Sequence, residues 1–79
     1  MDYKNFEESL RLKSYKSIFL KRRGDECFLI IDIDGTPHVL PKMDGKPRIY
    51  RHIWQLKDWL RLKFNIDVDS LEVKIDKNN

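Results

Sequence analysis

The sequence predicts one small α+β domain, in which short strands form an antiparallel meander that packs on one amphipathic helix. Three observations predict this class. Apolar residues follow a helical spacing twice, over residues 3–13 and 52–64. Three pairs of glycine and aspartate separate short runs rich in β-branched and aromatic residues. A final run, over residues 70–75, alternates apolar with charged residues. The expected order of elements is α-β-β-β-α-β.

The length and composition limit the class of protein. The 79 residues suffice for one domain, which we expect to span residues 1–79 and to end in a frayed tail at 76–79. A domain of this size buries only about 60% of the surface of its unfolded chain, so a binding partner can add stability. Apolar residues make up 41% and charged residues 37%, which is typical of a globular protein. The net charge of +3 is a mild basic bias.

The cysteine content and the apolar runs indicate a cytoplasmic protein. The single cysteine, Cys27, excludes a disulfide within the chain, and two histidines and one cysteine are too few for a structural zinc site. Residues 1–8 lack the apolar core of a signal peptide, and the longest apolar run, 27–31, is far too short to span a membrane. We therefore expect no metal, no cofactor and no membrane partner.

Residues 3–13 form the first predicted helix. Tyr3, Phe6 and Leu10 fall on one face at helical spacing, and Asp2 is a suitable N-cap. The alternation of apolar and charged residues over 10–12 leaves a strand open as an alternative. The sequence does not decide which face of the sheet this segment covers.

Three turn signals predict the meander: Gly24-Asp25, Asp34-Gly35 and Asp44-Gly45. A tight hairpin turn needs a residue with positive φ, which these pairs supply. When each is treated as a two-residue turn, the predicted partners are Leu20 with Leu29, Leu29 with Leu40, and Leu40 with Ile49. One residue along, they are Phe19 with Ile30, Ile30 with Val39, and Val39 with Tyr50. A slip of one residue would break this agreement. Pro41 and Pro47 flank the third turn and cannot donate ladder hydrogen bonds.

This register predicts a sheet with two apolar faces. One face carries aliphatic residues: Ile18, Leu20, Leu29, Ile31, Leu40 and Ile49. The other face is rich in aromatic residues: Phe19, Phe28, Ile30, Val39 and Tyr50, with Lys21, Asp32 and Arg48 among them. Both faces need cover. We expect the aliphatic face to pack on the helix at 52–64, and the aromatic face to be covered by the N-terminal helix, a second subunit or a ligand.

The helix at 52–64 has one clear apolar stripe: Ile53, Leu56, Leu60 and Phe64. Asn65 is suited to end it in the left-handed conformation. Trp54 and Leu62 lie on the opposite side of this helix. Beyond it, Leu71, Val73 and Ile75 alternate with charged residues and predict a half-buried strand.

Residues 29–36 (Leu-Ile-Ile-Asp-Ile-Asp-Gly-Thr) resemble the first motif of the haloacid dehalogenase phosphatases, in which the first aspartate is a nucleophile. That chemistry also needs a magnesium site and a phosphate-binding lysine from later strands. Here the following residues predict a hairpin return, so we reject a phosphatase and place Asp34-Gly35 in a turn. Cys27 and His38 are too far apart in register to form a thiol–imidazole pair. We therefore predict no enzyme and no catalytic residue.

Large apolar residues that the predicted core does not bury indicate a binding partner. Trp54 and Leu62 lie away from the helix stripe, and Phe19, Phe28 and Tyr50 lie on the aromatic sheet face. We predict a small non-enzymatic accessory or regulatory binding domain that acts through self-association or a protein partner, with these five residues as contacts. Coverage of all five within the chain is the alternative.

Basic residues interleaved with aromatic ones make a nucleic-acid-binding domain the second function to consider. The candidate contacts are Lys21, Arg22, Arg23, Lys46, Arg48 and Arg51. The order of the first five elements resembles that of double-stranded-RNA-binding domains, and a three-stranded sheet before a helix resembles some integrase DNA-binding domains. The lysine-rich helix start of the RNA-binding family is replaced here by residues 51–54, and an order of elements does not specify a function.

Four stretches together resemble a small proteobacterial family of uncharacterised function: residues 28–40, 44–48, 50–51 and 54–60. The similarity consists of a strand, a return strand, a Gly-Lys-Pro-like turn, an arginine–aromatic step and an amphipathic helix, within residues 15–62. The resemblance implies a bacterial cytosolic protein and supplies no catalytic residues.

Overall fold

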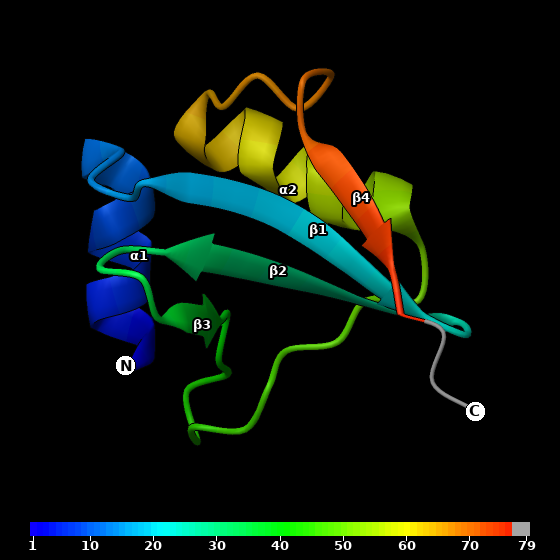
Figure 1. Ribbon diagram of the computed structural model, residues 1–79, viewed down its shortest axis with the longest axis horizontal. Helices are drawn as coiled ribbons and strands as arrows, with labels where there is room; N and C mark the ends of the chain where they lie inside the picture. Colours follow the sequence, from blue (N-terminus) through cyan, green and yellow to red (C-terminus); the bar gives the residue numbers. More distant parts are fainter. Residues whose placement is uncertain (77–79) are drawn as a thin grey trace.

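The computed structural model describes residues 1–76 and has the predicted order of elements (Figure 1). Helix α1 (Tyr3–Leu12) is followed by strands β1 (Ser17–Arg23), β2 (Glu26–Asp32) and β3 (Pro37–Val39). Helix α2 (Ile53–Phe64) and strand β4 (Glu72–Ile75) complete the fold. The predicted α+β class is confirmed.

The four strands form one mixed sheet in the order β3-β2-β1-β4. Strands β1, β2 and β3 make the predicted antiparallel meander, and β4 lies parallel to β1 at the opposite edge. The predicted partners Leu20 and Leu29 lie opposite each other, as do Ile30 and Val39. Gly24 and Gly35 have φ of +60° and +92° in the first two turns. The first two hairpins therefore have the predicted register.

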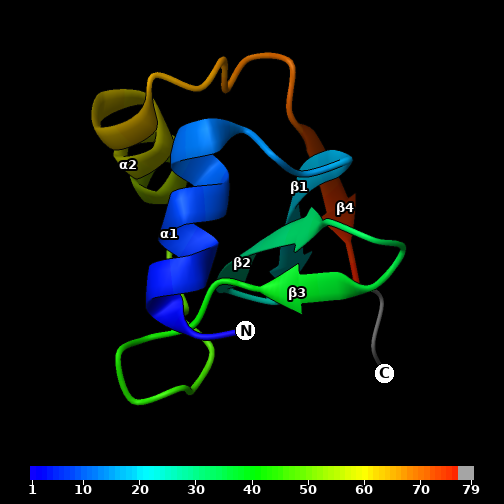
Figure 2. The same cartoon turned by 90° about the vertical axis from the view of Figure 1, so that its left-hand side faces the viewer.

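Both helices pack on the same face of the sheet (Figure 2). Residues 3–12 are helical rather than extended, and Asp2 caps α1 by accepting a hydrogen bond from the Asn5 N–H at 2.8 Å. Phe6 and Leu10 are fully buried, and Lys13 ends α1 in the left-handed conformation. The N-terminal segment thus covers the aliphatic face together with α2.

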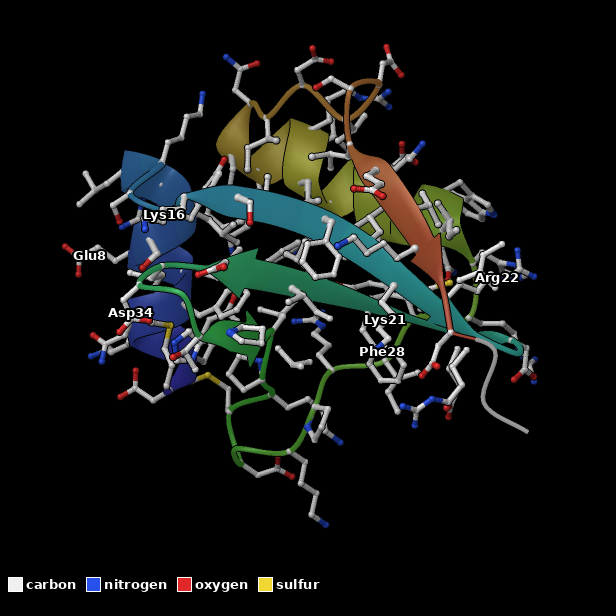
Figure 3. All side chains as sticks on the ribbon, in the orientation of Figure 1. Glu8, Lys16, Lys21, Arg22, Phe28 and Asp34 are labelled. Atoms are coloured by element: carbon white, nitrogen blue, oxygen red, sulfur yellow. The ribbon has the colours of Figure 1, made fainter. Side chains whose placement is uncertain are left out.

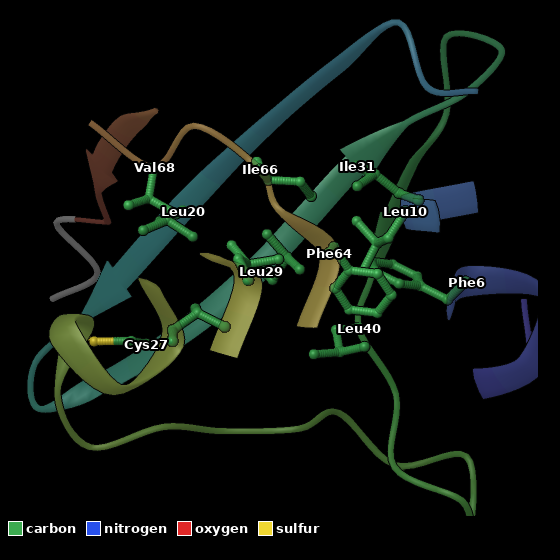
Figure 4. Packing of buried hydrophobic residues seen from close by; sticks show 12 residues of the cluster. Phe6, Leu10, Leu20, Cys27, Leu29, Ile31, Leu40, Phe64, Ile66 and Val68 are labelled. Carbon is green, nitrogen blue, oxygen red and sulfur yellow. The ribbon is translucent and has the colours of Figure 1, made fainter. Parts of the chain in front are cut away.

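The core lies between this face and the two helices (Figure 4). Its buried members are Phe6, Leu10, Leu20, Cys27, Leu29, Ile31, Leu40, Leu56, Leu60, Phe64, Ile66 and Val68. The predicted stripe of α2 is confirmed, with Ile53 half-buried at its start, and Asn65 ends α2 with φ of 54°. Full burial of one such side chain contributes about 1.5–3 kcal/mol.

The third hairpin differs from the predicted register by one residue. Lys42 donates to the Lys46 carbonyl at 2.7 Å, and the Arg48 N–H donates to the Leu40 carbonyl at 2.8 Å. Leu40 therefore lies opposite Arg48 and not opposite Ile49. The reason is a loop of three residues, 43–45, where the prediction had a two-residue turn. Pro41 and Pro47 lie opposite each other in this hairpin and lack the N–H groups that would strengthen another register.

This shift moves three side chains to faces other than those predicted, since successive residues of an extended segment point to opposite sides. Ile49 is exposed instead of buried in the core. Tyr50 pairs with Cys27 of β2 through two backbone hydrogen bonds, of 2.7 and 2.9 Å, and packs against the core. Arg48 lies over the rings of Tyr50 and Trp59, on the helix-bearing side.

The C-terminal strand is shorter than the predicted 70–75. Val73 packs against the core from β4, whereas Ile75 is exposed. Asp76 belonged to the predicted frayed tail, but its N–H donates to the Arg22 carbonyl at 2.7 Å and extends the pairing of β4 with β1. The rest of that predicted tail lies outside the described residues.

Two leucines of α2 offer a matched test of this core. Leu56 is fully buried, and Leu62 is 80% exposed on the opposite side of the same helix. We expect Leu56→Ala to lower the free energy of unfolding by about 2–5 kcal/mol, because it leaves a cavity. Leu62→Ala should change it by less than about 0.5 kcal/mol. Urea denaturation followed by circular dichroism measures both, and equal losses would contradict the placement of α2.

Candidate functional site

One face of the sheet is not covered by either helix, and we call it the open face (Figure 2). Strand alternation and pairing place these side chains on it: Phe19, Lys21, Arg23, Glu26, Phe28, Ile30, Asp32, Val39, Glu72 and Lys74. Figure 3 looks onto this face, where Lys21 and Phe28 stand side by side in front of the sheet. Of the predicted partner contacts, Phe19 and Phe28 lie here.

The centre of the open face is apolar. Phe19, Ile30 and Val39 lie in one row across β1, β2 and β3. Phe28 lies in the next row, beside Lys21. Phe28, Ile30 and Val39 form part of a shallow hollow of about 230 Å³, which is also lined by Lys21, Arg23 and Pro47. Ile30 is buried by its neighbours, whereas Val39 is exposed.

The cations of the open face are paired within the protein. The Asp76 carboxylate lies 2.9 Å from the Arg23 guanidinium and 3.8 Å from the Lys21 ammonium. Lys74 lies 4.2 Å from the centre of the Phe19 ring. Glu26, Asp32 and Glu72 add further carboxylates to this face. The open face therefore carries charges of both signs around an apolar centre and is not a basic patch.

The other predicted partner contacts lie elsewhere. Tyr50 was predicted on the aromatic face, but it lies on the helix-bearing side, where its hydroxyl is buried without a hydrogen-bond partner among residues 1–76. Burial raises the pKa of the Tyr50 hydroxyl. Trp54 and Leu62 are both exposed on the outer side of α2, at 62% and 80%. The His52 ring stacks on Trp54, with ring centres 6.1 Å apart.

The predicted nucleic-acid contacts are divided between three places. Lys21 and Arg23 lie on the open face. Arg22 alternates to the opposite face of the sheet, and its side chain donates to the Gly24 carbonyl at 3.0 Å. Lys46, Arg48 and Arg51 follow β3 along the chain. The sheet does not gather these six cations into one surface.

Residues 41–51, which we call the basic segment, concentrate the positive charge of the chain. They contain Lys42, Lys46, Arg48 and Arg51 with Asp44 as their one carboxylate, so their net charge of +3 equals that of the whole chain. Among the described residues, the ion pairs do not involve any of these four cations. Our sequence prediction omitted Lys42 from the candidate contacts. A count of charge in short windows would have found it.

A cleft of about 550 Å³ separates the basic segment from the start of α1. It is lined by Tyr3, Lys42, Met43, Pro47, Arg48 and Ile49. The Arg48 guanidinium is held 5.3 Å from the centre of the Tyr50 ring and 5.6 Å from that of Trp59. Met43 is 82% exposed and Ile49 is 49% exposed. The cleft is thus both cationic and apolar.

An ion pair joins α1 to α2 behind this cleft. The Lys63 ammonium lies 2.9 Å from the Glu7 carboxylate and donates to the Tyr3 hydroxyl at 3.3 Å. The Tyr3 hydroxyl donates in turn to Glu7 at 3.2 Å. The hydrogen bond from Lys63 lowers the pKa of Glu7, and the same bond raises the pKa of Lys63. This network holds Tyr3 at the edge of the cleft.

The residues that suggested catalysis have structural roles. The Asp32 carboxylate accepts a hydrogen bond from the Gly35 N–H at 2.6 Å and so stabilises the second hairpin turn. Cys27 is buried in the core, and burial raises the pKa of its thiol. Within residues 1–76, histidine, cysteine and carboxylate side chains do not form a group of three or more that could hold a metal ion. Neither described helix is long and apolar enough to cross a membrane.

Comparisons with known proteins leave the site to be interpreted from its own geometry. No protein-family model, curated protein or solved structure matches this chain. The resemblance to a proteobacterial family therefore stays an expectation.

The Glu7–Lys63 pair predicts a change in the acid dependence of stability. A carboxyl whose pKa is lower in the folded state stabilises the fold at higher pH, and this contribution is lost as the pH falls through the folded-state value. For Glu7 that window lies below 4.5. We expect Glu7→Gln to cost less than about 1 kcal/mol at neutral pH. The variant should also lose less stability than the wild type on acidification.

Urea midpoints measured from neutral to acid pH test this expectation. Glu8→Gln is the matched control, because Glu8 is exposed on the same helix and takes part in none of the described ion pairs. The control should follow the wild-type profile. An identical response of the two variants would contradict a specific role of Glu7.

Cys27 provides a test of the packing beneath the Tyr50 bridge. Its thiol is buried and its pKa is raised, so thiolate attack on a reagent requires local opening. We expect an aromatic disulfide reagent at neutral pH to label the native protein roughly a hundredfold more slowly than the urea-unfolded protein. Equal labelling rates would show that this region of β2 is not closed.

Proposed function

We propose that this chain is a small non-enzymatic binding domain that pairs with a second copy through the open face. One observation carries the proposal: both helices cover one side of the sheet, and Phe19, Phe28 and Val39 stand on the other. A solvated sheet face normally carries polar side chains at such central positions. Covering these apolar side chains gains about 25 cal/mol for each Å² of apolar surface removed from water.

The charges of the open face favour a second copy over a nucleic acid. A phosphate backbone would approach Glu26, Asp32 and Glu72 as well as cations that Asp76 already neutralises. A second copy instead offers both signs of charge. A surface with an apolar centre and mixed charges is suited to a two-fold interface, in which the same patch serves both subunits.

A specific arrangement follows from the register of β1 and β2. A two-fold axis along the strands would stack β1 of one copy over β2 of the other, as in aligned sheet packing. Because Phe19 is paired with Ile30 and Arg23 with Glu26 within one copy, the same partners would meet between copies. Phe19 would then pack on Ile30 of the second copy, and Arg23 would face its Glu26.

The interface that one sheet face can form is small. A standard interface buries about 800 Å² on each partner. That area is about one-seventh of the 5404 Å² that this chain exposes. One face of a four-stranded sheet lies at the lower end of the usual range of interface areas. Interfaces of that size are typical of weak association, so we expect the dimer to form at micromolar concentration.

Sedimentation equilibrium of the wild type and of Phe28→Asp tests the pairing. We expect the substitution to weaken the dimer by at least about tenfold, because it places a carboxylate in the apolar centre. Trp54→Asp is the control, since Trp54 is a large exposed ring on α2, away from the open face. It should leave the dimer intact, and circular dichroism should report folded protein for both variants. A wild type that remains monomeric up to millimolar concentration would overturn the proposal.

A charge swap tests the proposed register of the interface. Arg23→Glu should weaken the dimer because it faces Glu26 of the second copy, and the double variant Arg23→Glu with Glu26→Arg should restore it. Failure of the double variant to recover association, while it remains folded, would exclude this arrangement.

A further inference from the structure

We propose that the basic segment and the first turn of α1 form a second docking site, for an acidic segment of a different protein that places an apolar side chain in the cleft. This site is distinct from the dimer contact. Its cleft shares Pro47 with the hollow of the open face, but its other lining residues, which include Tyr3, Met43 and Ile49, do not line that hollow. The proposal does not depend on the dimer.

The positive charge of the basic segment indicates that the partner is negatively charged. Its four cations, together with Asp44, sum to +3, which equals the net charge of the chain, and the ion pairs among the described residues do not neutralise these cations. Elsewhere the basic and acidic residues balance. Such local concentration of one sign raises the association rate of an oppositely charged partner.

The lining of the cleft indicates that the partner carries apolar side chains as well as negative charge. Met43 and Ile49 expose apolar surface in the same cleft that Lys42 and Arg48 line. An inorganic anion would leave this surface in water, whereas an acidic peptide with leucine or phenylalanine would cover it. The Arg48 guanidinium can bind a carboxylate through two parallel hydrogen bonds.

The aromatic rings near the cleft favour a peptide over single-stranded nucleic acid. Nucleic-acid platforms need free ring faces on which bases stack. Here the Lys63 ammonium lies 5.9 Å from the centre of the Tyr3 ring. The Arg48 guanidinium likewise lies over the rings of Tyr50 and Trp59. Stacking of bases would have to displace these cations, whereas an acidic peptide can use them as they stand.

The hairpin is held in place before any partner binds. The Lys42 N–H bonds to the Lys46 carbonyl at 2.7 Å, and the Asp44 side chain accepts from the Lys46 N–H at 3.0 Å. The Arg48 N–H bonds to the Leu40 carbonyl at 2.8 Å. A preformed site loses less conformational entropy on binding, which favours affinity.

The test uses a fluorescein-labelled synthetic peptide in which pairs of glutamates flank single leucines. The peptide is titrated with the 79-residue chain, and binding is followed by fluorescence anisotropy. We expect saturable binding that weakens as salt is raised. Lys42→Glu with Lys46→Glu should raise the Kd by at least about tenfold. The matched control is Lys16→Glu with Lys57→Glu, which changes the net charge equally at lysines outside the cleft, and it should raise the Kd by less than about threefold. Met43→Ser should also weaken binding.

Three further measurements decide the proposal. If a glutamate-only peptide binds as tightly as the leucine-bearing peptide, the proposal that an apolar side chain of the partner enters the cleft is wrong. We also measure an oligouridylate of equal length. If it binds more tightly than the leucine-bearing peptide, and its Kd rises equally in the Lys42→Glu and Lys46→Glu double variant, the partner is a nucleic acid and not a protein. Phe28→Asp should bind the peptide like the wild type, and a loss there in a folded variant would show that the two sites are not separate.

Discussion

Leu20, Leu29 and Leu40 stand side by side on three neighbouring strands, and both helices bury them on the same side of the sheet. A chain of 79 residues has enough apolar surface for one such layered core. Because α1 and α2 are both used on this side, the chain has no described element left to cover the other. The half-buried Phe19 and the exposed Val39 on the open face follow directly from that distribution of helices, and they are the basis of the proposed pairing of two copies.

The path of the chain after β3, over residues 41–50, shapes both the core and the cleft. The hairpin at 41–48 is a residue out of the expected register, and the chain then crosses to β2, where Tyr50 pairs with Cys27. This path places the Tyr50 ring against the core and leaves Ile49 in solvent. It also brings the Arg48 guanidinium of the hairpin over the Trp59 ring of α2. One turn of three residues thus determines both the closure of the core at Cys27 and the cationic, apolar cleft beside α1.

The distribution of charge separates the two proposed surfaces. On the open face, Asp76 lies against Lys21 and Arg23, so the sheet presents a nearly balanced surface. In the basic segment, the cations stand without described carboxylate partners. The first arrangement suits a surface that pairs with itself, and the second suits a partner of opposite charge. A small domain with both could join a self-association contact to the recognition of another protein.

The sequence by itself determined the class, the order of the elements, the first two hairpins and the buried stripe of α2. Each depends on local physics: helical spacing of apolar residues, an aspartate cap at Asp2, and glycines with positive φ between strands. It also placed Phe19 and Phe28 correctly on the second face of the sheet. Only the tertiary structure decided which face α1 covers, because an amphipathic helix can pack on either. It also decided the side of Tyr50, since a turn of two or three residues around Asp44 and Gly45 has nearly the same local signal but reverses every side chain beyond it.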